Sequence, residues 1–355
     1  MEKYSGLIAT NGTHWHDVRR FTLRHLRDLG MGKSKMVSAV QFEASELVES
    51  MKKDAGKSKP LTTDIKIAVI NVLWQMVASK RYKFDDKMVL EFDDLMNKLQ
   101  NNFGYLMLEY VDEHQKNLDE NNPRDFIDDY LIEIERQKSN PDSTMSIRDL
   151  LGCTADLFGA GYQTTATAIC WSIYYMSKFP ETQRKLQKEI DEVLTNKRQA
   201  SLEDKPRLPY TEAFINETLR YASQTQFHLP RTVTKDTKLL GYTIPKDSLI
   251  FPAAEAVHYD RSHFDSPKEF RPERFLNSNG RFEFPKSGYF PFGTGKRQCI
   301  GESLARMELL IFITTLVQRL QFSIPNGETL NISPQDIPLF NMPRFDQNIL
   351  IKIRN

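Results

Sequence analysis

One short loop constrains this chain more than any other segment. Residues 292–301 place a single cysteine, Cys299, among three glycines and close to a basic pair. Glycines let a backbone turn tightly and approach a flat ligand closely. An apolar, helix-compatible run follows at 303–312, and the N–H groups at a helix start, like nearby cations, favour a thiolate. The loop therefore suits an axial iron ligand, and the alternative is a buried structural cysteine.

Composition excludes several classes of protein. The 48 Lys and Arg residues nearly balance the 47 Asp and Glu residues, so no global positive field predicts nucleic-acid binding. The three cysteines show no C-x-x-C spacing, which is typical of a reducing compartment rather than of a disulfide framework. No apolar run approaches the eighteen or so residues of a membrane span, and the first residues lack the hydrophobic region of a signal peptide.

The pattern F-x-x-G-x-R-x-C-x-G is met at every position by Phe292, Gly295, Arg297, Cys299 and Gly301. This pattern closely resembles the heme-binding loop of the cytochrome P-450 monooxygenases, and its flanks look like the animal microsomal branch, especially family 2. The resemblance implies a mainly α fold with small β-sheets, an incomplete cytochrome P-450 fold. It also implies a heme b cofactor whose iron takes the Cys299 thiolate as its axial ligand.

The segment 15–27 reads as an amphipathic helix. Trp15 and Arg19 are four residues apart and share one face of it. In the resembled family this pair reaches a heme propionate, whereas the alternative is an ordinary aromatic–cation pair on the surface. Arg20, Arg24 and Arg27 form a second, basic face. The resemblance implies that an acidic reductase docks there, and the alternative is a solvated face.

A long helix is predicted over 146–179. Ser146 stands three residues before Asp149, as in a helix N-cap, and Pro180 stops the apolar period. Glycines interrupt its centre at 159 and 161, which makes sense if something flat lies against the helix.

That centre resembles the groove in which the family binds O2. The resemblance places Ala160 against the heme and gives Thr164 the oxygen-activating position. Gln163 stands where the family usually carries a carboxylate, and an amide cannot release and recapture a proton near neutral pH. Slow proton delivery would release reduced oxygen as peroxide, and the alternative is that ordered water carries protons past Gln163.

Two further motifs complete the resemblance. Glu217 and Arg220 lie at i, i+3 on a predicted helix, and Arg274 follows in a P-E-R-F segment. In the family these three form a buried, structural charge triad that fixes the cysteine loop. Residues 229–248 read as a hairpin, and the resemblance implies that Arg231 holds a heme propionate together with Trp15, Arg19 and Arg297.

Three aromatic residues are candidate contacts of the substrate pocket. They are Phe158, Tyr162 and Phe227, and the alternative is that an aromatic at helical spacing is simply core.

Relative to the family, the chain lacks the N-terminal membrane anchor and most of the first sheet, and it is short between Phe84 and Glu113, where the family has its mobile lid. We therefore expect residues 1–355 to form a single heme-thiolate monooxygenase domain. A truncated gene model, a splice form and a genuine short protein all explain the gaps.

The resemblance implies monooxygenation of a small apolar substrate with electrons from NADPH. A separate flavin reductase would deliver them, with cytochrome b5 as a second candidate donor. It also implies the cytoplasmic face of the endoplasmic reticulum membrane, or the cytoplasm if the anchor is truly missing. The alternatives are a non-catalytic or unstable heme-binding fragment and a peroxide-using variant.

Overall fold

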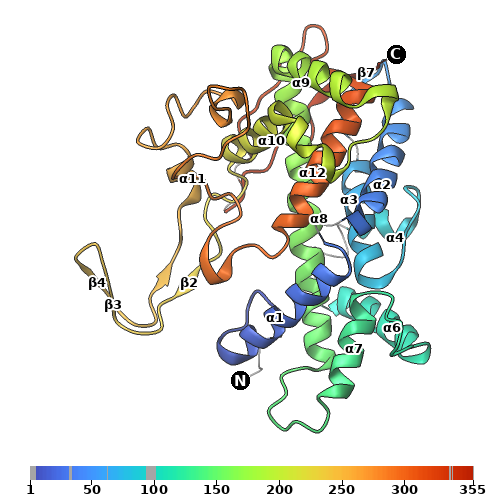
Figure 1. Ribbon diagram of the computed structural model, residues 1–355, viewed down its shortest axis with the longest axis vertical. Coiled ribbons are helices and arrows are strands. Elements are labelled where there is room, and N and C mark those ends of the chain that lie inside the picture. Colours follow the sequence, from blue (N-terminus) through green and yellow to red (C-terminus); the bar gives the residue numbers. More distant parts are fainter. Residues whose placement is uncertain are drawn as a thin grey trace.

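The chain is mainly helical with small β-sheets, as predicted (Figure 1). The computed structural model describes residues 5–31, 34–61, 63–92, 101–335, 337 and 339–354. The described helices are α1 (Gly12–Asp28), α2 (Ser34–Lys52), α3 (Asp64–Ala78), α4 (Lys87–Leu90), α6 (Asn101–Lys116), α7 (Phe126–Arg136), α8 (Ile147–Lys178), α9 (Pro180–Val193), α10 (Pro209–Ala222), α11 (Ala254–His258) and α12 (Glu302–Arg319). The described strands are β1 (Ser58–Pro60), β2 (Arg231–Thr232), β3 (Thr237–Leu239), β4 (Tyr242–Ile244), β5 (Leu249–Ile250), β6 (Leu320–Ser323) and β7 (Asn348–Ile353).

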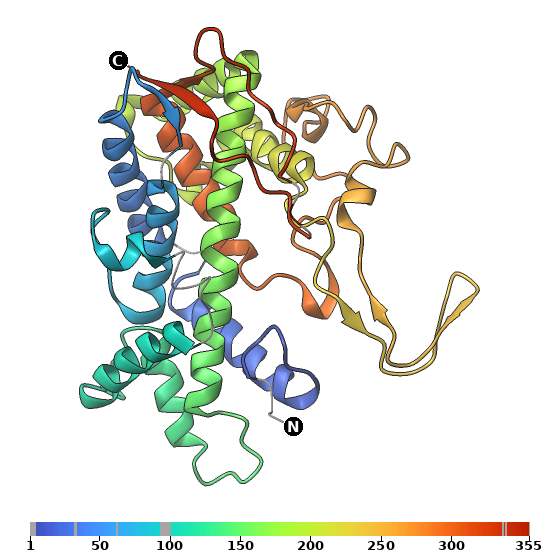
Figure 2. The same cartoon turned by 180° about the vertical axis from the view of Figure 1, so that it is seen from behind.

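The helix α8 runs the length of the helical body (Figures 1 and 2). Ser146 caps it by accepting a hydrogen bond from the backbone N–H of Asp149 at 3.1 Å, which satisfies one of the free donors at the helix start. The helix ends at Lys178, and Pro180 then begins α9. The predicted boundaries at 146 and 179 are therefore confirmed.

The core lies where α2, α3 and α12 meet α8. Both α3 and α12 pack against α8, and α2 contacts both of them. The helix α3 is buried on almost every side, so it reads as a core helix rather than an amphipathic one. Each fully buried Leu, Ile or Val in this core stabilises the fold by about 1.5–3 kcal/mol relative to exposure. The long helix thereby becomes a fixed wall for the site.

In the described part of the chain, three small antiparallel sheets accompany the helices. The central strand of the largest is β7, with β1 on one side and β6 on the other. The strands β2 and β5 pair with Arg231 opposite Ile250. The strands β3 and β4 pair with Leu239 opposite Tyr242 around a tight turn, and this hairpin stands away from the helices in both views (Figures 1 and 2). The hairpin predicted over 229–248 is thus two paired segments.

Within the described residues, no helix is both long and apolar enough to span a membrane.

Candidate heme site

The cysteine loop leads directly into α12. Gly293 and Gly295 adopt φ values of 74° and 75°, in the left-handed region that glycine enters without strain. The backbone N–H of Cys299 donates to the carbonyl of Phe292 at 2.9 Å, which closes the loop into a tight turn. Cys299 is a free, exposed cysteine. A sulfur on a closed loop with an open side is available to an external ligand.

Two opposing influences act on the Cys299 thiol. Protein that surrounds its sulfur partly desolvates it and so raises the pKa of the thiol, although the residue as a whole is exposed. The backbone N–H of Gly301 and the charge of Arg19 act in the opposite direction. A coordinated metal deprotonates a thiol outright. The thiolate form therefore depends on the iron that the loop would bind.

The sequence-predicted cations converge beside this loop. The guanidinium carbon of Arg297 lies 3.9 Å from the centre of the Trp15 ring, and that of Arg19 lies 5.5 Å from it. Arg231 is close enough to repel both guanidinium groups. Partial burial lowers the pKa of Arg19, Arg231 and Arg297, and mutual repulsion lowers it further for Arg19 and Arg297. We call these three arginines the cation cluster.

The cation cluster has only neutral partners. Arg19 donates to the carbonyl of Gln298 at 2.6 Å, Arg297 donates to the carbonyl of Thr10 at 2.8 Å, and Arg231 donates to the carbonyl of Leu229 at 2.7 Å. In the part of the chain that the structure describes, no carboxylate lies within ion-pair distance of these guanidinium groups.

Two buried nitrogens nearby also have no hydrogen-bond partner among the described residues. They are Nε1 of Trp15 and Nε2 of His228, and a buried polar atom without a partner is costly. His228 lies close to Gly293 of the cysteine loop and feels the charge of Arg231. Sequence reasoning missed His228, although its place three residues before Arg231 could have drawn attention to it.

The unsatisfied donors and unpaired cations fit a group with two carboxylates. Heme b carries two propionates, and hydrogen bonds between guanidinium and carboxylate are among the strongest in proteins. The residues present therefore fit heme, with Trp15 and the cation cluster at its propionates and Cys299 at its iron.

The centre of α8 is exposed at the glycine-interrupted segment, where the sequence predicts that something flat lies against the helix. Gly159 and Ala160 are exposed although most of the surrounding helix is buried. The hydroxyl of Thr164 donates to the carbonyl of Ala160 at 2.7 Å, and Gln163 is half-buried beside it. Within the described residues, Ala160, Gln163 and Thr164 share no hydrogen bond with the cysteine loop. These three residues, all on α8, form a surface separate from the cysteine loop, and we call this surface the open wall.

The structure brings Glu217, Arg220 and Arg274 together as a buried charge triad. Arg220 donates to Glu217 through two nitrogens at 2.7 and 2.8 Å, and Arg274 donates to the same carboxylate at 3.0 Å. Arg220 also donates to the backbone carbonyls of His258 and Pro267. These bonds tie α10 to the segments that precede the cysteine loop.

The three candidate pocket aromatics differ in their surroundings. Phe158 is fully buried, with its ring 4.5 Å from the ring of Trp74, so the core alternative holds for it. Tyr162 is also buried and packs edge-on against Phe92. Phe227 is exposed and lines an open cavity with Glu255, Tyr259 and Lys268.

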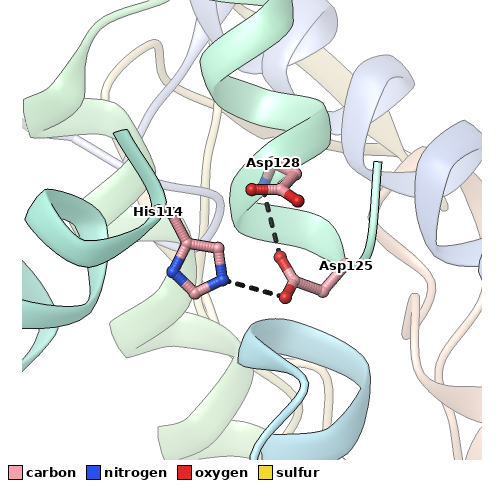
Figure 3. Close-up of side chains that lie close together, drawn as sticks. All are labelled: His114, Asp125 and Asp128. Atoms are coloured by element: carbon pink, nitrogen blue, oxygen red, sulfur yellow. Dashed lines mark hydrogen bonds and ion pairs between the residues drawn. The ribbon is translucent and has the colours of Figure 1, made fainter. Parts of the chain in front are cut away.

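Another cluster of potential ligands lies between α6 and α7. The side chains of His114, Asp125 and Asp128 are buried and face one another (Figure 3). His114 lies 2.9 Å from Asp125, Asp125 caps α7 through the N–H groups of Ile127 and Asp128, and Asp128 holds the guanidinium of Arg124. Each polar atom therefore has a protein partner, and the cluster links α6 to α7.

The chain is mainly helical and combines a cysteine loop, an unpaired cation cluster and an open helix wall. This is the arrangement of a heme-thiolate protein. The family model for cytochrome P-450 matches residues 1–112 and 103–346 of the chain. The chain belongs to the cytochrome P-450 family.

Curated relatives agree over most of the chain. Cytochrome P-450 2L1 of Panulirus argus is 38% identical over 97% of this chain and 78% of its own length. Cytochrome P-450 2C23 of Rattus norvegicus is 37% identical, with 95% and 75% covered. Cytochrome P-450 2C8 of Homo sapiens is 36% identical, with 95% and 76% covered. The chain is therefore a family 2-like, heme-dependent monooxygenase that uses heme b and takes electrons from a redox partner.

Proposed function

We propose that this chain hydroxylates small apolar substrates with electrons that reach it from NADPH through a separate flavin reductase. The observation that carries the proposal is the cation cluster beside Cys299, three partly buried guanidinium groups that form no ion pair with any described carboxylate. Three like charges held close together repel one another, so a dianion that binds beside them is favoured electrostatically.

The roles at the heme follow from these contacts. Arg19, Arg231 and Arg297 would hold the propionates through charge-assisted hydrogen bonds, each worth about 1.5–3 kcal/mol. Trp15 would donate through the indole nitrogen that lacks a partner. Cys299 would supply its thiolate to the iron, and the exposed backbone at Ala160 would let the flat ring approach α8.

When bound, heme supplies the activation of O2 that converts RH, O2, two electrons and two protons into ROH and water. Thr164 holds a proton on its hydroxyl, 2.7 Å from the carbonyl of Ala160, and is half-buried at the open wall. Gln163 can orient water through its amide but cannot deliver a proton. The chain thus carries the alcohol of the proposed proton-delivery pair, with the amide of Gln163 where the family usually has a carboxylate.

Electron entry is proposed at the basic face of α1. Arg20, Arg24 and Arg27 are exposed on the same helix that carries Trp15 and Arg19. An acidic reductase face, or that of cytochrome b5, would be steered to these charges, and salt would weaken the encounter. Arg24→Glu should slow reduction at low salt, whereas Lys188→Glu on α9 should not, and equal rates for the two would contradict this docking face.

The proposed function also predicts how the chain is organised into domains and where it lies in the cell. We propose that residues 1–355 fold as one catalytic domain, because α2, α3, α8 and α12 share one core. We place it at the cytoplasmic face of the endoplasmic reticulum membrane, as the family 2-like relatives support. A single cooperative unfolding transition and recovery in the microsomal fraction are the expected results.

Reconstituted turnover tests the proposed function. The heme-loaded chain is mixed with a flavin reductase, NADPH and a panel of small apolar compounds, and hydroxylated product is measured. We expect product only when reductase and NADPH are both present. Product from peroxide alone would instead identify a peroxide-using enzyme. No product in either arm would leave a non-catalytic heme-binding chain and overturn the proposal.

A further inference from the structure

A buried histidine joins the end of α6 to the start of α7. His114 is 2% exposed and lies in the last turn of α6. Its Nδ1 atom lies 2.6 Å from the carbonyl oxygen of Tyr110, and its Nε2 atom lies 2.9 Å from Oδ2 of Asp125 (Figure 3). A neutral imidazole has one N–H and can donate to only one of these two acceptors, whereas an imidazolium donates to both.

The carboxylates around His114 place the second proton on its ring. Asp125 accepts hydrogen bonds from the backbone N–H groups of Ile127 and Asp128 through its other oxygen, at 3.1 and 3.2 Å, as a capping carboxylate does. Asp128 already has a cation, because Arg124 donates to it through Nε and Nη2 at 2.6 and 2.9 Å. The cation that pairs with Asp125 is therefore His114.

The two helix ends favour the same distribution of charge. His114 stands at the C-terminal end of α6, where the helix dipole attracts a cation, and Asp125 caps the N-terminal end of α7, where the dipole attracts an anion. Among the described residues, the charged groups around this contact form two ion pairs of their own, Asp128 with Arg124 and Glu113 with Lys80.

The protonation of His114 depends on these neighbours. Burial alone would lower the pKa of His114, but the hydrogen bond and charge of Asp125, the carbonyl of Tyr110 and the charge of Asp128 together raise it above its usual value. The folded chain thus holds this proton more tightly than the unfolded chain does. The stability that the contact contributes is complete below the usual histidine pKa of about 6.5, and it is lost as the pH rises through the higher folded value.

The same turn of α6 covers an aromatic contact beside the open wall. The ring of Tyr110 lies 5.0 Å from the ring of Trp74 on α3. Trp74 in turn lies 4.5 Å from the ring of Phe158 on α8, which directly precedes the exposed Gly159 and Ala160. The carbonyl that the imidazolium holds therefore belongs to the residue that packs α6 against this contact.

We propose that the contact between His114 and Asp125 is a proton-operated clasp, which locks α6 onto α7 and releases it when His114 loses its proton in alkaline solution. With the proton in place, His114 donates to both acceptors and the two helix ends stay together. When a base removes the proton, the neutral ring turns a lone pair toward one acceptor, and this repulsion frees the last turn of α6. The clasp thereby makes the cover over the aromatic contact depend on pH.

Nitrogen NMR of the heme-free chain with labelled histidine tests the protonation directly. At pH 7, the signals that disappear in His114→Gln should have the shifts of an imidazolium, with both ring nitrogens protonated. They should change to those of a neutral ring only in alkaline solution. In Asp125→Asn this change should occur at lower pH, because the amide can still cap α7 but carries no charge. A neutral His114 ring at pH 7 in the parent chain would overturn the inference.

Hydrogen exchange of the full chain, with and without heme, shows whether proton loss releases α6. After correction for the intrinsic pH dependence of exchange, protection of the α6 amides should fall several-fold across the pH range in which His114 titrates, while protection of α9 stays constant. His114→Gln should show low α6 protection without a pH step, and Asp125→Asn should move the step to lower pH.

The matched control for exchange is His25→Gln. This variant removes a histidine that lies 3.1 Å from another carboxylate of α7, that of Asp129, and it should keep the α6 step. The inference fails if α6 follows α9 in the parent chain, or if the step survives unchanged in both His114→Gln and Asp125→Asn.

The consequence for the open wall rests on the proposed function. Binding of toluene to the heme-loaded chain, followed by the change in heme absorbance, should become several-fold faster across the α6 step and show no such step in His114→Gln. Equal pH dependence in the two chains would contradict a clasp that controls access. A chain that shows the α6 step but takes up no heme would contradict the proposed function instead, which separates the two failures.

Discussion

Two groups of arginines in this chain are built in opposite ways. In the charge triad, Arg220 and Arg274 share the carboxylate of Glu217, and all three side chains are nearly inaccessible to solvent. In the cation cluster, Arg19, Arg231 and Arg297 stand near one another and pair with no carboxylate in the described part of the chain. Their partners are backbone carbonyls and an amide oxygen.

The difference shows which group of arginines has all its charges paired by the protein itself. The protein alone satisfies the charge triad, so that group stabilises the fold whether or not a ligand is present. The cation cluster leaves positive charge and a buried indole N–H unsatisfied, and only a ligand with negative charge completes it. Of these two groups, the complete one fits a structural role and the incomplete one fits ligand binding.

The largest expected effect on stability comes from removing the carboxylate of the charge triad. Glu217→Ala would strand Arg220 and Arg274 as buried, unpaired cations, and the free energy of unfolding should fall by about 3–5 kcal/mol. Denaturant unfolding of the heme-free chain measures this loss. A change below 1 kcal/mol would mean that the triad is not a structural element, and the comparison would break.

Removing an arginine from the cation cluster should affect heme binding more than the stability of the fold. Arg297→Ala relieves the repulsion among three like charges but also removes hydrogen bonds to Thr10 and Asn11, so the heme-free chain should lose much less stability than in Glu217→Ala. Heme affinity should fall, because a charge-assisted hydrogen bond is worth about 1.5–3 kcal/mol. Titration of the apoprotein with heme measures this.

The control for Arg297 is Arg20→Ala, an exposed cation on α1 that should leave heme affinity unchanged. Equal losses of heme affinity for Arg297→Ala and Arg20→Ala would show that the cation cluster has no special role.

Glu308 extends the comparison of paired and unpaired charges from arginines to a buried acid. Because burial raises its pKa to about 8, the folded chain keeps a proton that the unfolded chain loses near pH 4.5. Stability contributed by this proton is present below pH 4.5 and is lost as pH rises toward 8, by up to about 1.4 kcal/mol per pH unit. Relative to Glu308→Gln, the parent chain should therefore lose stability across this window. Parallel stability–pH curves for the two chains would contradict an uncharged Glu308.

Features with local causes could be predicted from the sequence. The ends of α8 follow from a serine cap at Ser146 and a proline at Pro180, both of which act within one helical turn. The cysteine loop follows in part from Gly293 and Gly295, whose left-handed backbone is a local property. The pairing of Glu217 with Arg274, 57 residues away, was predictable only from the family resemblance.

Features created by packing between helices could not be predicted. Nothing in the sequence near Glu308 reveals that it will form no ion pair with any described cation, because its neighbours come from other helices. Phe158 illustrates the same limit, since its burial against Trp74 depends on how α3 meets α8. His228 lay next to a predicted residue, yet its unsatisfied nitrogen becomes evident only in three dimensions.

The carbon monoxide difference spectrum of the reduced, heme-loaded chain tests the central claim most directly, with Cys299→Ala beside it. The claim is that the incomplete cation cluster holds heme with the Cys299 thiolate at its iron. We predict a strongly red-shifted Soret band that disappears in Cys299→Ala. Failure to take up heme, or a band typical of a neutral ligand in the parent chain, would contradict the account.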